Sequence, residues 1–216
     1  TSRPVRVTPV GDDRPSRPPR ARDDPTAPQP FPWMDANDAN LGRYRWKSYT
    51  QAYDAYTNYI YAGNLVRQGR LKDSLRYYRA AVEQDESFGE AWNDLAQVYK
   101  ELAAFDKADR CIHKALAVDA HNPVYHHTTG EIHQARSFHL FGDALDDQDL
   151  AKAVQAKHNA LKSYNRAIQE AERQGRLAQQ AGTYFRIGEI CYFLNQDAVG
   201  AGMYWSKVLS FHTPTP

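Results

Sequence analysis

The sequence has few cysteines, no long apolar run and almost no net charge, and each shortage excludes a class of protein. Only two of the 216 residues are cysteine, Cys111 and Cys191, and neither belongs to a CxxC pair, which excludes a zinc knuckle and a haem-attachment motif. No stretch approaches the roughly 18 consecutive apolar residues of a spanning helix, so we expect no direct membrane insertion. Lysine and arginine total 27 against 26 acidic residues, a balance that gives no field to attract nucleic acid.

Motifs for catalysis and metal binding are also missing. The sequence contains no nucleophile motif, phosphate-binding glycine loop or dinucleotide fingerprint. Four histidines share one predicted helix with Glu131, but only His127 lies four residues from it, the spacing of helical metal ligands. We therefore predict no enzyme, no metal, no cofactor and no small-molecule substrate. For the two cysteines we expect buried thiols, with a disulfide or a reactive thiol as the alternative.

Proline is concentrated in residues 1–32, together with arginine and aspartate. Proline lacks the backbone donor and disfavours helix, so we expect an extended or polyproline II arm. Aspartates on both sides of Arg14 to Arg22 reduce its attraction for phosphates, and we predict no nucleic-acid partner. The arm's expected apolar anchors are Val5, Val10, Phe31 and Trp33. The alternative is that Phe31 and Trp33 fold back onto the first helix of their own chain.

Residues 33–54 follow as a predicted aromatic-rich linker or capping helix. The residues Trp46, Tyr49, Tyr53, Tyr56 and Ile60 recur at three- and four-residue steps, which indicates an amphipathic helix. Two interpretations stay open for this stripe, packing on the next helices or an exposed partner-binding face. The sequence does not begin with Met, from which we expect an exported protein, periplasmic or extracellular, with the cytoplasm as the alternative.

A repeat of 34 residues begins near residue 55. Residues 89–122 carry small residues at Ala96, Ala108 and Ala115, where two helices approach closely, and larger residues between them at Trp92, Leu95, Tyr99 and Phe105. Residues 55–88 repeat the pattern in phase, with Gly69 at the inter-helix turn. A third unit over 123–180 contains about eighteen inserted residues, and a fourth spans 181–214. Shared equally around a turn at 142–149, the insertion adds roughly nine residues to each helix, about 13 Å.

These units resemble the tetratricopeptide repeat family, most specifically over residues 89–122. The resemblance implies an all-α, right-handed superhelix of about four helical hairpins, one of them lengthened, over residues 55–214. It also implies that the first helix of each repeat lines an inner surface that binds an extended peptide or a partner helix. By register, the partner-binding residues are Tyr59, Arg67, Asn93, Asp94, Gln97, Lys100, His127, Glu131, Phe185, Arg186 and Glu189.

The inner surface lacks the set of Lys and Asn residues with which some family members clamp a carboxylate, so we do not expect chaperone-tail binding. The favoured function is a protein–protein interaction scaffold, a structural subunit of a larger assembly such as a cell-surface or filament complex. Its groove and arm would hold protein partners, including copies of the chain itself. The alternative is an assembly or biogenesis factor that binds client peptides in the groove.

Overall fold

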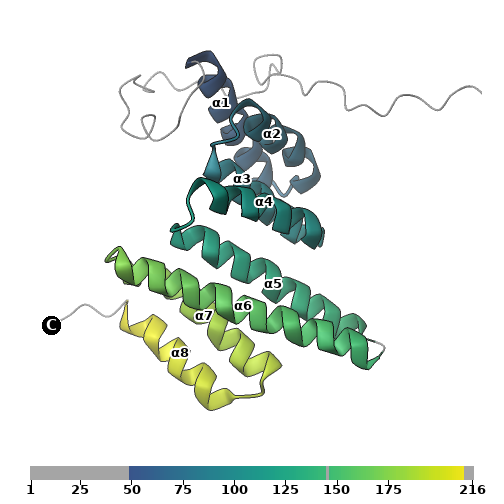
Figure 1. Ribbon diagram of the computed structural model, residues 1–216, viewed down its shortest axis with the longest axis vertical. Helices are drawn as coiled ribbons and strands as arrows, with labels where there is room; N and C mark the ends of the chain where they lie inside the picture. The colour runs from purple at the N-terminus through teal and green to yellow at the C-terminus, as the bar shows by residue number, and fades with distance from the viewer. Residues whose placement is uncertain (1–48, 145, 212–216) are drawn as a thin grey trace, which may run out of the picture.

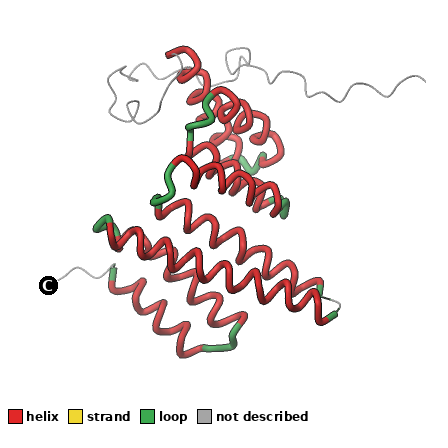
Figure 2. The backbone as a smooth tube through the Cα atoms, viewed as in Figure 1, coloured by secondary structure: helices red, strands yellow, loops and turns green. Residues whose placement is uncertain are grey.

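The computed structural model describes residues 49–144 and 146–211, and every regular element in these ranges is helical (Figures 1 and 2). The predicted all-helical stack of hairpins is confirmed. In chain order the α-helices are α1 (Tyr49–Arg67), α2 (Leu71–Gln84), α3 (Gly89–Glu101), α4 (Phe105–Val118), α5 (Pro123–Asp143), α6 (Asp147–Arg173), α7 (Ala181–Glu189) and α8 (Ala198–Ser210). A 3-10 turn, Leu177–Gln180, precedes α7, and a π-helical turn, Ile190–Leu194, extends it.

Consecutive helices pair into four hairpins that follow one another along the long axis of the molecule, from α1 at one end to α8 at the other (Figure 1). Each hairpin packs on the next, so neighbouring repeats cover each other's apolar faces. The stack is a superhelix in which a hairpin's first helix lies beside the first helix of the next repeat. This arrangement brings residues about one repeat apart into contact.

The turns inside the first two hairpins have the same backbone conformation. Gly69 ends α1 with φ of +75°, and Ala103, one repeat later, ends α3 with φ of +53°. In both turns the next amide donates to a carbonyl five residues back, Arg70 to Leu65 and Ala104 to Tyr99, at 2.9 Å. Glycine adopts this left-handed conformation without steric cost, whereas alanine does not. The repeat therefore fixes the turn geometry even where its glycine is absent.

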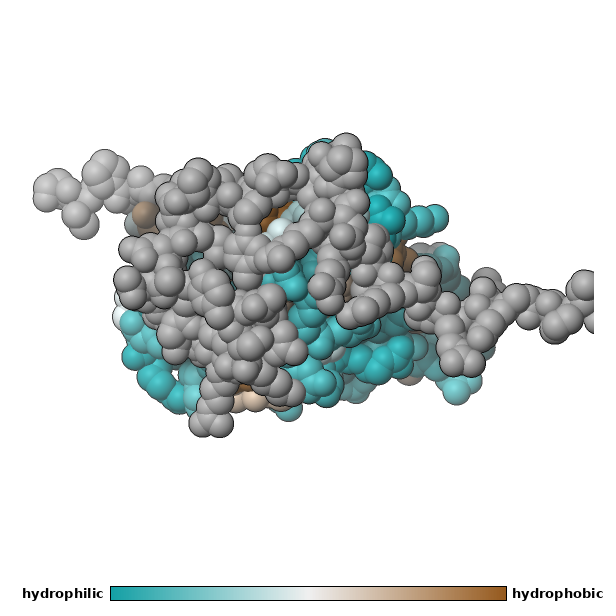
Figure 3. Space-filling model, turned by 90° about the horizontal axis from the view of Figure 1, so that it is seen from above, coloured by the Kyte–Doolittle hydropathy of each residue, from teal (hydrophilic) through white to brown (hydrophobic). Residues whose placement is uncertain are grey.

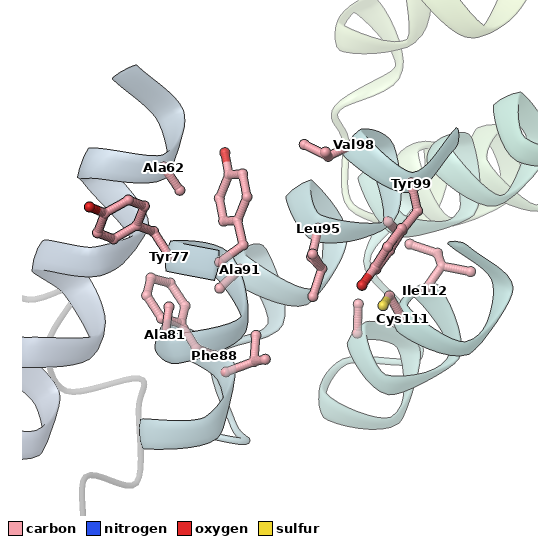
Figure 4. Close-up of a cluster of buried hydrophobic side chains, with 14 of the residues drawn as sticks. Ala62, Tyr77, Ala81, Phe88, Ala91, Leu95, Val98, Tyr99, Cys111 and Ile112 are labelled. Atoms are coloured by element: carbon pink, nitrogen blue, oxygen red, sulfur yellow. The ribbon is translucent and has the colours of Figure 1, made fainter. Parts of the chain in front are cut away.

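Small residues allow the helices of the first two hairpins to approach each other, and large ones fill the space between them (Figure 4). Leu95 and Ile112 are fully buried in this core together with Tyr77. The alanines at the predicted close contacts have no exposed surface: Ala62, Ala81, Ala96, Ala108 and Ala115. Such interdigitation is what the 34-residue pattern encodes, because only a small side chain fits where two backbones nearly touch.

The third hairpin is the lengthened one, and the predicted turn between its helices is confirmed. Helix α5 ends at Asp143 and α6 begins at Asp147, where the carboxylate of Asp146 caps α6 by accepting a hydrogen bond from the Asp149 amide at 2.8 Å. The expectation of equal lengthening is wrong. Helix α5 has 21 residues against 13 in α3, whereas α6 has 27 against 14 in α4. The second helix takes the larger share.

Gly130 occupies the close contact of this third hairpin. A Cβ atom built at this position would lie 2.4 Å from ring carbons of Tyr164, which has no exposed surface. The last hairpin has the same kind of contact, because a Cβ atom at Gly188 would lie 2.4 Å from the Nε1 atom of Trp205. In both hairpins glycine is needed because an aromatic ring of the second helix lies flat on the first helix.

Helix α1 runs without a break across residue 55, so residues 49–54 and the helix expected from residue 55 form one element. The rest of the predicted segment 33–54, and the whole arm 1–32, lie outside the described residues. Seen from the α1 end, the visible described surface is mainly hydrophilic, with hydrophobic residues in small patches (Figure 3).

Candidate functional site

The first helices of the hairpins form a surface with two adjoining hollows, which we call the groove. The α1–α3 hollow has a volume of about 610 Å³ and the α3–α7 hollow about 230 Å³, and Glu101 lines both. The α1–α3 hollow is lined by Tyr59, Ile60, Gly63, Val66, Arg67, Leu71, Tyr78, Asp94, Gln97, Val98 and Glu101. The α3–α7 hollow is lined by Lys100, Glu101, Glu131, Gln134, Ala135, Phe138, Arg186 and Glu189.

Two tyrosines and a carboxylate define the α1–α3 hollow. The rings of Tyr59 and Tyr78 lie 5.9 Å apart, centroid to centroid, at an angle of 58°. Burial raises the pKa of Asp94, while hydrogen bonds from Tyr59 and Asn93 oppose that rise. Burial and the neighbouring Asp94 charge also raise the pKa of both tyrosines, which therefore stay neutral donors. The hollow thus combines aromatic walls with one desolvated carboxylate.

Ion pairs that join three repeats line the α3–α7 hollow. Glu131 of α5 lies between Lys100 of α3, at 3.2 Å, and Arg186 of α7, at 3.0 Å. Arg186 also pairs with Glu189 at 3.0 Å, and the Nε2 atom of His127 lies 3.7 Å from Glu131. Burial alone would raise the pKa of Glu131, but the His127 hydrogen bond and the charges of Lys100, His127 and Arg186 lower it to about 2. These charges fix the relative positions of α3, α5 and α7.

Aromatic side chains continue the groove beyond this charge cluster. Phe138 of α5 and Phe193 of the π-helical turn are in ring contact at 6.5 Å, and 60% of Phe193 is exposed. Single π-helical turns occur often at functional positions because they reorient side chains on an otherwise regular helix. Phe138 lies seven residues after Glu131, on the same helical face. Continuing the three- and four-residue steps from Glu131 would have found it in the sequence.

Eight of the eleven sequence-predicted groove residues line the two hollows: Tyr59, Arg67, Asp94, Gln97, Lys100, Glu131, Arg186 and Glu189. Asn93 does not, because only 4% of it is exposed. His127 lies next to the α3–α7 hollow, where its Nδ1 atom is 2.8 Å from the Thr183 hydroxyl. Phe185 packs against Trp205 of α8. The arm residues Val5, Val10, Phe31 and Trp33 lie outside the described residues.

The lining residues that sequence reasoning missed include some from a second helix and some from the first helix of the third hairpin. Tyr78 of α2 enters the α1–α3 hollow between first helices, and Gln134 joins the α3–α7 hollow from α5. The family register predicts groove residues only on the first helix of each repeat, so it did not indicate Tyr78 of α2. Gln134 lies three residues after Glu131, a helical step that would have indicated it.

Both cysteines are free and buried, as predicted for the two thiols. Burial raises the pKa of the Cys111 thiol to about 11 and also raises that of Cys191. Within residues 49–144 and 146–211, no three His, Cys, Asp or Glu side chains are grouped as a metal ion would require. In the same ranges, no helix is both long enough and apolar enough to cross a bilayer.

Comparisons with known proteins agree with this architecture. A model of the tetratricopeptide repeat family matches residues 65–132. The crystal structure of MamA superposes with a TM-score of 0.53 at 14% identity, over 73% of this chain and 78% of that one. A structure titled human IFIT1 dimer with m7Gppp-AAAA gives a TM-score of 0.50 at 16% identity, over 75% of this chain.

The chain corresponds to only 43% of human IFIT1. At these identities the structural matches show the fold alone. No curated protein matches the sequence significantly. The 34-residue period, the alanines and glycines at the helix contacts, the stacked hairpins and the family match lead to the same conclusion: residues 65–132 are tetratricopeptide repeats, and the described helices form a superhelix of the same type.

Proposed function

We propose that this protein is a non-enzymatic interaction scaffold and a structural subunit of a larger assembly, with a segment of a partner protein bound in its groove. The observation that carries the proposal is the groove itself, two adjoining hollows lined by the first helices of all four repeats. Tetratricopeptide repeat domains bind protein partners, and a continuous hollow along stacked helices fits an extended chain or a helix.

The chemistry of the groove favours a polypeptide over a nucleic acid. Its hollows contain four carboxylates, those of Asp94, Glu101, Glu131 and Glu189, against three cations, Arg67, Lys100 and Arg186, so they have no surplus of positive charge to attract phosphates. Exposed aromatic rings at Phe138 and Phe193 offer apolar contacts at the other end. Aromatic side chains with low conformational entropy are frequent hot spots of protein interfaces.

The proline-rich arm is proposed to bind outside its own repeat domain. Ordering each backbone residue costs about 1–2 kcal/mol, and a proline-rich chain has less freedom to lose. Val5, Val10, Phe31 and Trp33 are the apolar anchors proposed to offset the remaining cost. Six arginines of the arm can form charge-assisted hydrogen bonds with the partner surface.

A photo-crosslinking amino acid at Gln97, which lines the α1–α3 hollow, tests the role of the groove. We expect one defined partner protein to crosslink from this position in the cells that produce the chain. The matched control is Glu83, exposed on α2 outside both hollows, from which the same partner should not crosslink. Equal crosslinking from both positions would contradict groove binding.

A truncation that begins at Asp35 tests the arm. We expect the truncated chain to keep its helical circular dichroism and lose affinity for the assembly, measured by co-sedimentation with the partner identified above. Unchanged affinity would rule out the arm's role and favour the assembly factor that binds client peptides in its groove. If the full chain carrying Phe31→Ala and Trp33→Ala binds the partner as tightly as the wild type, these two residues are not anchors of the arm.

A further inference from the structure

Asp94 is the carboxylate of the groove that has no cation beside it. Its partners are Asn93, whose Nδ2 donates to the Asp94 Oδ1 atom at 3.1 Å, and the hydroxyl of Tyr59. Glu131 and Glu189 in the neighbouring hollow are each paired with Lys100 or Arg186. Among the described residues, no Lys, Arg or His lies within ion-pair distance of Asp94. Its charge is desolvated yet not neutralised.

The surroundings of Asp94 contain more acceptors than donors. The Oδ1 atom of Asn93, which is 96% buried, has no hydrogen-bond partner in the described part of the chain. Buried acceptors of this kind cost free energy unless a donor reaches them. The Asp94 carboxylate therefore lines the α1–α3 hollow, and a buried acceptor without a donor belongs to the neighbouring residue, Asn93.

The net charge of the groups around Asp94 favours the binding of a cation. Glu90, on the same helix, adds negative charge that acts on Asp94, while the charge of Glu101 is paired with Lys100 at 3.2 Å. Arg67 is the cation that lines the hollow, and its guanidinium donates to the Asn64 side chain instead of to Asp94. No cation of the described residues therefore pairs with the Asp94 carboxylate, although Arg67 lines the same hollow.

The walls of the hollow suit a long cationic side chain. The ring of Tyr59, which packs at 58° on the buried ring of Tyr78, lines the hollow, and Ile60 and Val66 add aliphatic surface. A Cβ atom at Gly63, which also lines the hollow, would lie in ordinary van der Waals contact with the Tyr78 hydroxyl, at 3.8 Å. Aromatic faces attract guanidinium groups, and burying the methylene stem contributes hydrophobic stabilisation.

We propose that the α1–α3 hollow binds an arginine side chain of the partner polypeptide, with its guanidinium on Asp94 and its stem against Tyr59, Ile60 and Val66. Arginine fits better than lysine because its planar fork offers five donors, can bond a carboxylate in bidentate fashion and stacks on rings. This inference rests on the proposed groove binding and adds the chemistry of one side chain that the groove selects.

The test uses the full chain, labelled with ¹⁵N, and the peptide acetyl-Gly-Ala-Arg-Ala-Gly-amide. Its control is the same peptide with citrulline, which keeps the shape of arginine without the charge. We expect the arginine peptide to shift the amide signals of Gly63 and Gln97, and the citrulline peptide to bind about tenfold more weakly. Equal affinity for the two peptides would overturn the proposal.

Two substitutions of carboxylates separate the hollow from the general charge of the surface. Asp94→Asn is nearly isosteric and should weaken binding of the arginine peptide about tenfold. Glu172→Gln removes a carboxylate exposed on α6 and should leave binding unchanged. Equal effects of both would show attraction by net charge and overturn the site. If Asp94→Asn lowers the melting temperature markedly, it is replaced by Ile60→Ala, which shortens a half-buried side chain of the hollow and keeps the carboxylate. This variant should also weaken binding.

The arm of the chain itself is the rival occupant. One outcome would identify the arm as the occupant: the wild-type chain does not bind the peptide, but a variant with all six arm arginines changed to glutamine does. The hollow would then bind the arm, and the assignment to a partner polypeptide would be overturned. Crosslinking from Gln97 gives an independent readout. A partner captured there without any preference for arginine over citrulline would leave the scaffold function standing and refute this inference alone.

Discussion

The first two hairpins and the last two have the same architecture but are held together by different contacts. The apolar core around α1 to α4, together with Tyr125 and Ile132 of α5, joins twenty buried residues, whereas that between α6, α7 and α8 joins six. Buried polar residues show the opposite distribution. Three of them lie in the first two hairpins, and six follow residue 123: Thr128, Gln134, Ser137, Glu170, Gln180 and Thr183.

Hydrogen bonds and ion pairs connect these polar residues across the last repeats. Gln134 accepts a hydrogen bond from the Tyr164 hydroxyl at 2.5 Å and donates to Glu189 at 3.4 Å. The Glu170 carboxylate, which has no exposed surface, is paired with Arg166 at 2.7 Å and Arg173 at 3.2 Å. Removing one partner of such a buried pair leaves the other unsatisfied.

The difference shows that one repeat geometry can be stabilised in two ways. Apolar packing depends on volume and hardly on pH or salt, whereas the polar contacts depend on orientation and on protonation. The α3–α7 hollow lies where the polar contacts dominate, and the α1–α3 hollow lies against the apolar core. Four substitutions or conditions test this division, from the largest expected effect to the smallest.

Leu95→Ala is expected to lower the free energy of unfolding by about 2–5 kcal/mol, because Leu95 is fully buried in the apolar core and its truncation leaves a cavity. Urea denaturation followed by circular dichroism measures the change. Leu209→Ala, the same substitution at a position 67% exposed on α8, should change stability by less than about 0.5 kcal/mol. Similar effects at both positions would contradict the proposed core.

Acid should destabilise the last repeats through Glu131. Because its pKa falls from 4.5 to about 2 on folding, the ionised carboxylate stabilises the fold above about pH 4.5, and this contribution is lost as the pH falls toward 2. The loss is on the order of 3 kcal/mol. Urea titrations of the wild type and Glu131→Gln at several pH values measure it as the difference between the two curves. A difference that stays constant between pH 5 and pH 2 would refute the assigned role of these charges.

Gly130→Ala should destabilise by about 1–3 kcal/mol, since the added methyl group would overlap the buried ring of Tyr164. Thermal unfolding compares it with Gly142→Ala in the same helix, where nothing lies within 4 Å of the new Cβ atom. The control should be neutral or slightly stabilising, because alanine favours helix over glycine. If Gly130→Ala is also neutral, α5 and α6 are further apart than described.

Ala103→Gly and Gln196→Gly should each stabilise the protein by up to about 1 kcal/mol. Both residues have positive φ, +53° and +54°, which glycine adopts without steric cost. Ala103 lies in the first two hairpins and Gln196 in the last two. Equal gains in stability would show that the preference for glycine at positive φ holds in both regions. Differential scanning calorimetry measures the changes. Destabilisation by either substitution would mean that its side chain matters more than its backbone.

The sequence by itself determined the helical repeat, its phase and most of the groove. The 34-residue spacing placed small residues at Ala96 and Ala108, and a period of this length is typical of stacked helical hairpins. Because each repeat reuses the same register, eight of eleven proposed groove residues lie in the two hollows. The turn after Asp143 was likewise predictable, since its cluster of Gly and Asp residues favours a helix boundary.

The tertiary structure alone decided how far each position is buried and which charges meet. Asn93 has the same register as Tyr59 and His127, which are half-buried, yet only 4% of Asn93 is exposed. Lys100, Glu131 and Arg186 are 31 and 55 residues apart, and their contact depends on how closely three helices stack. Periodicity gives the direction of a side chain from its own helix. The size and distance of the facing helices, which set burial and ion pairing, depend on every residue packed between them.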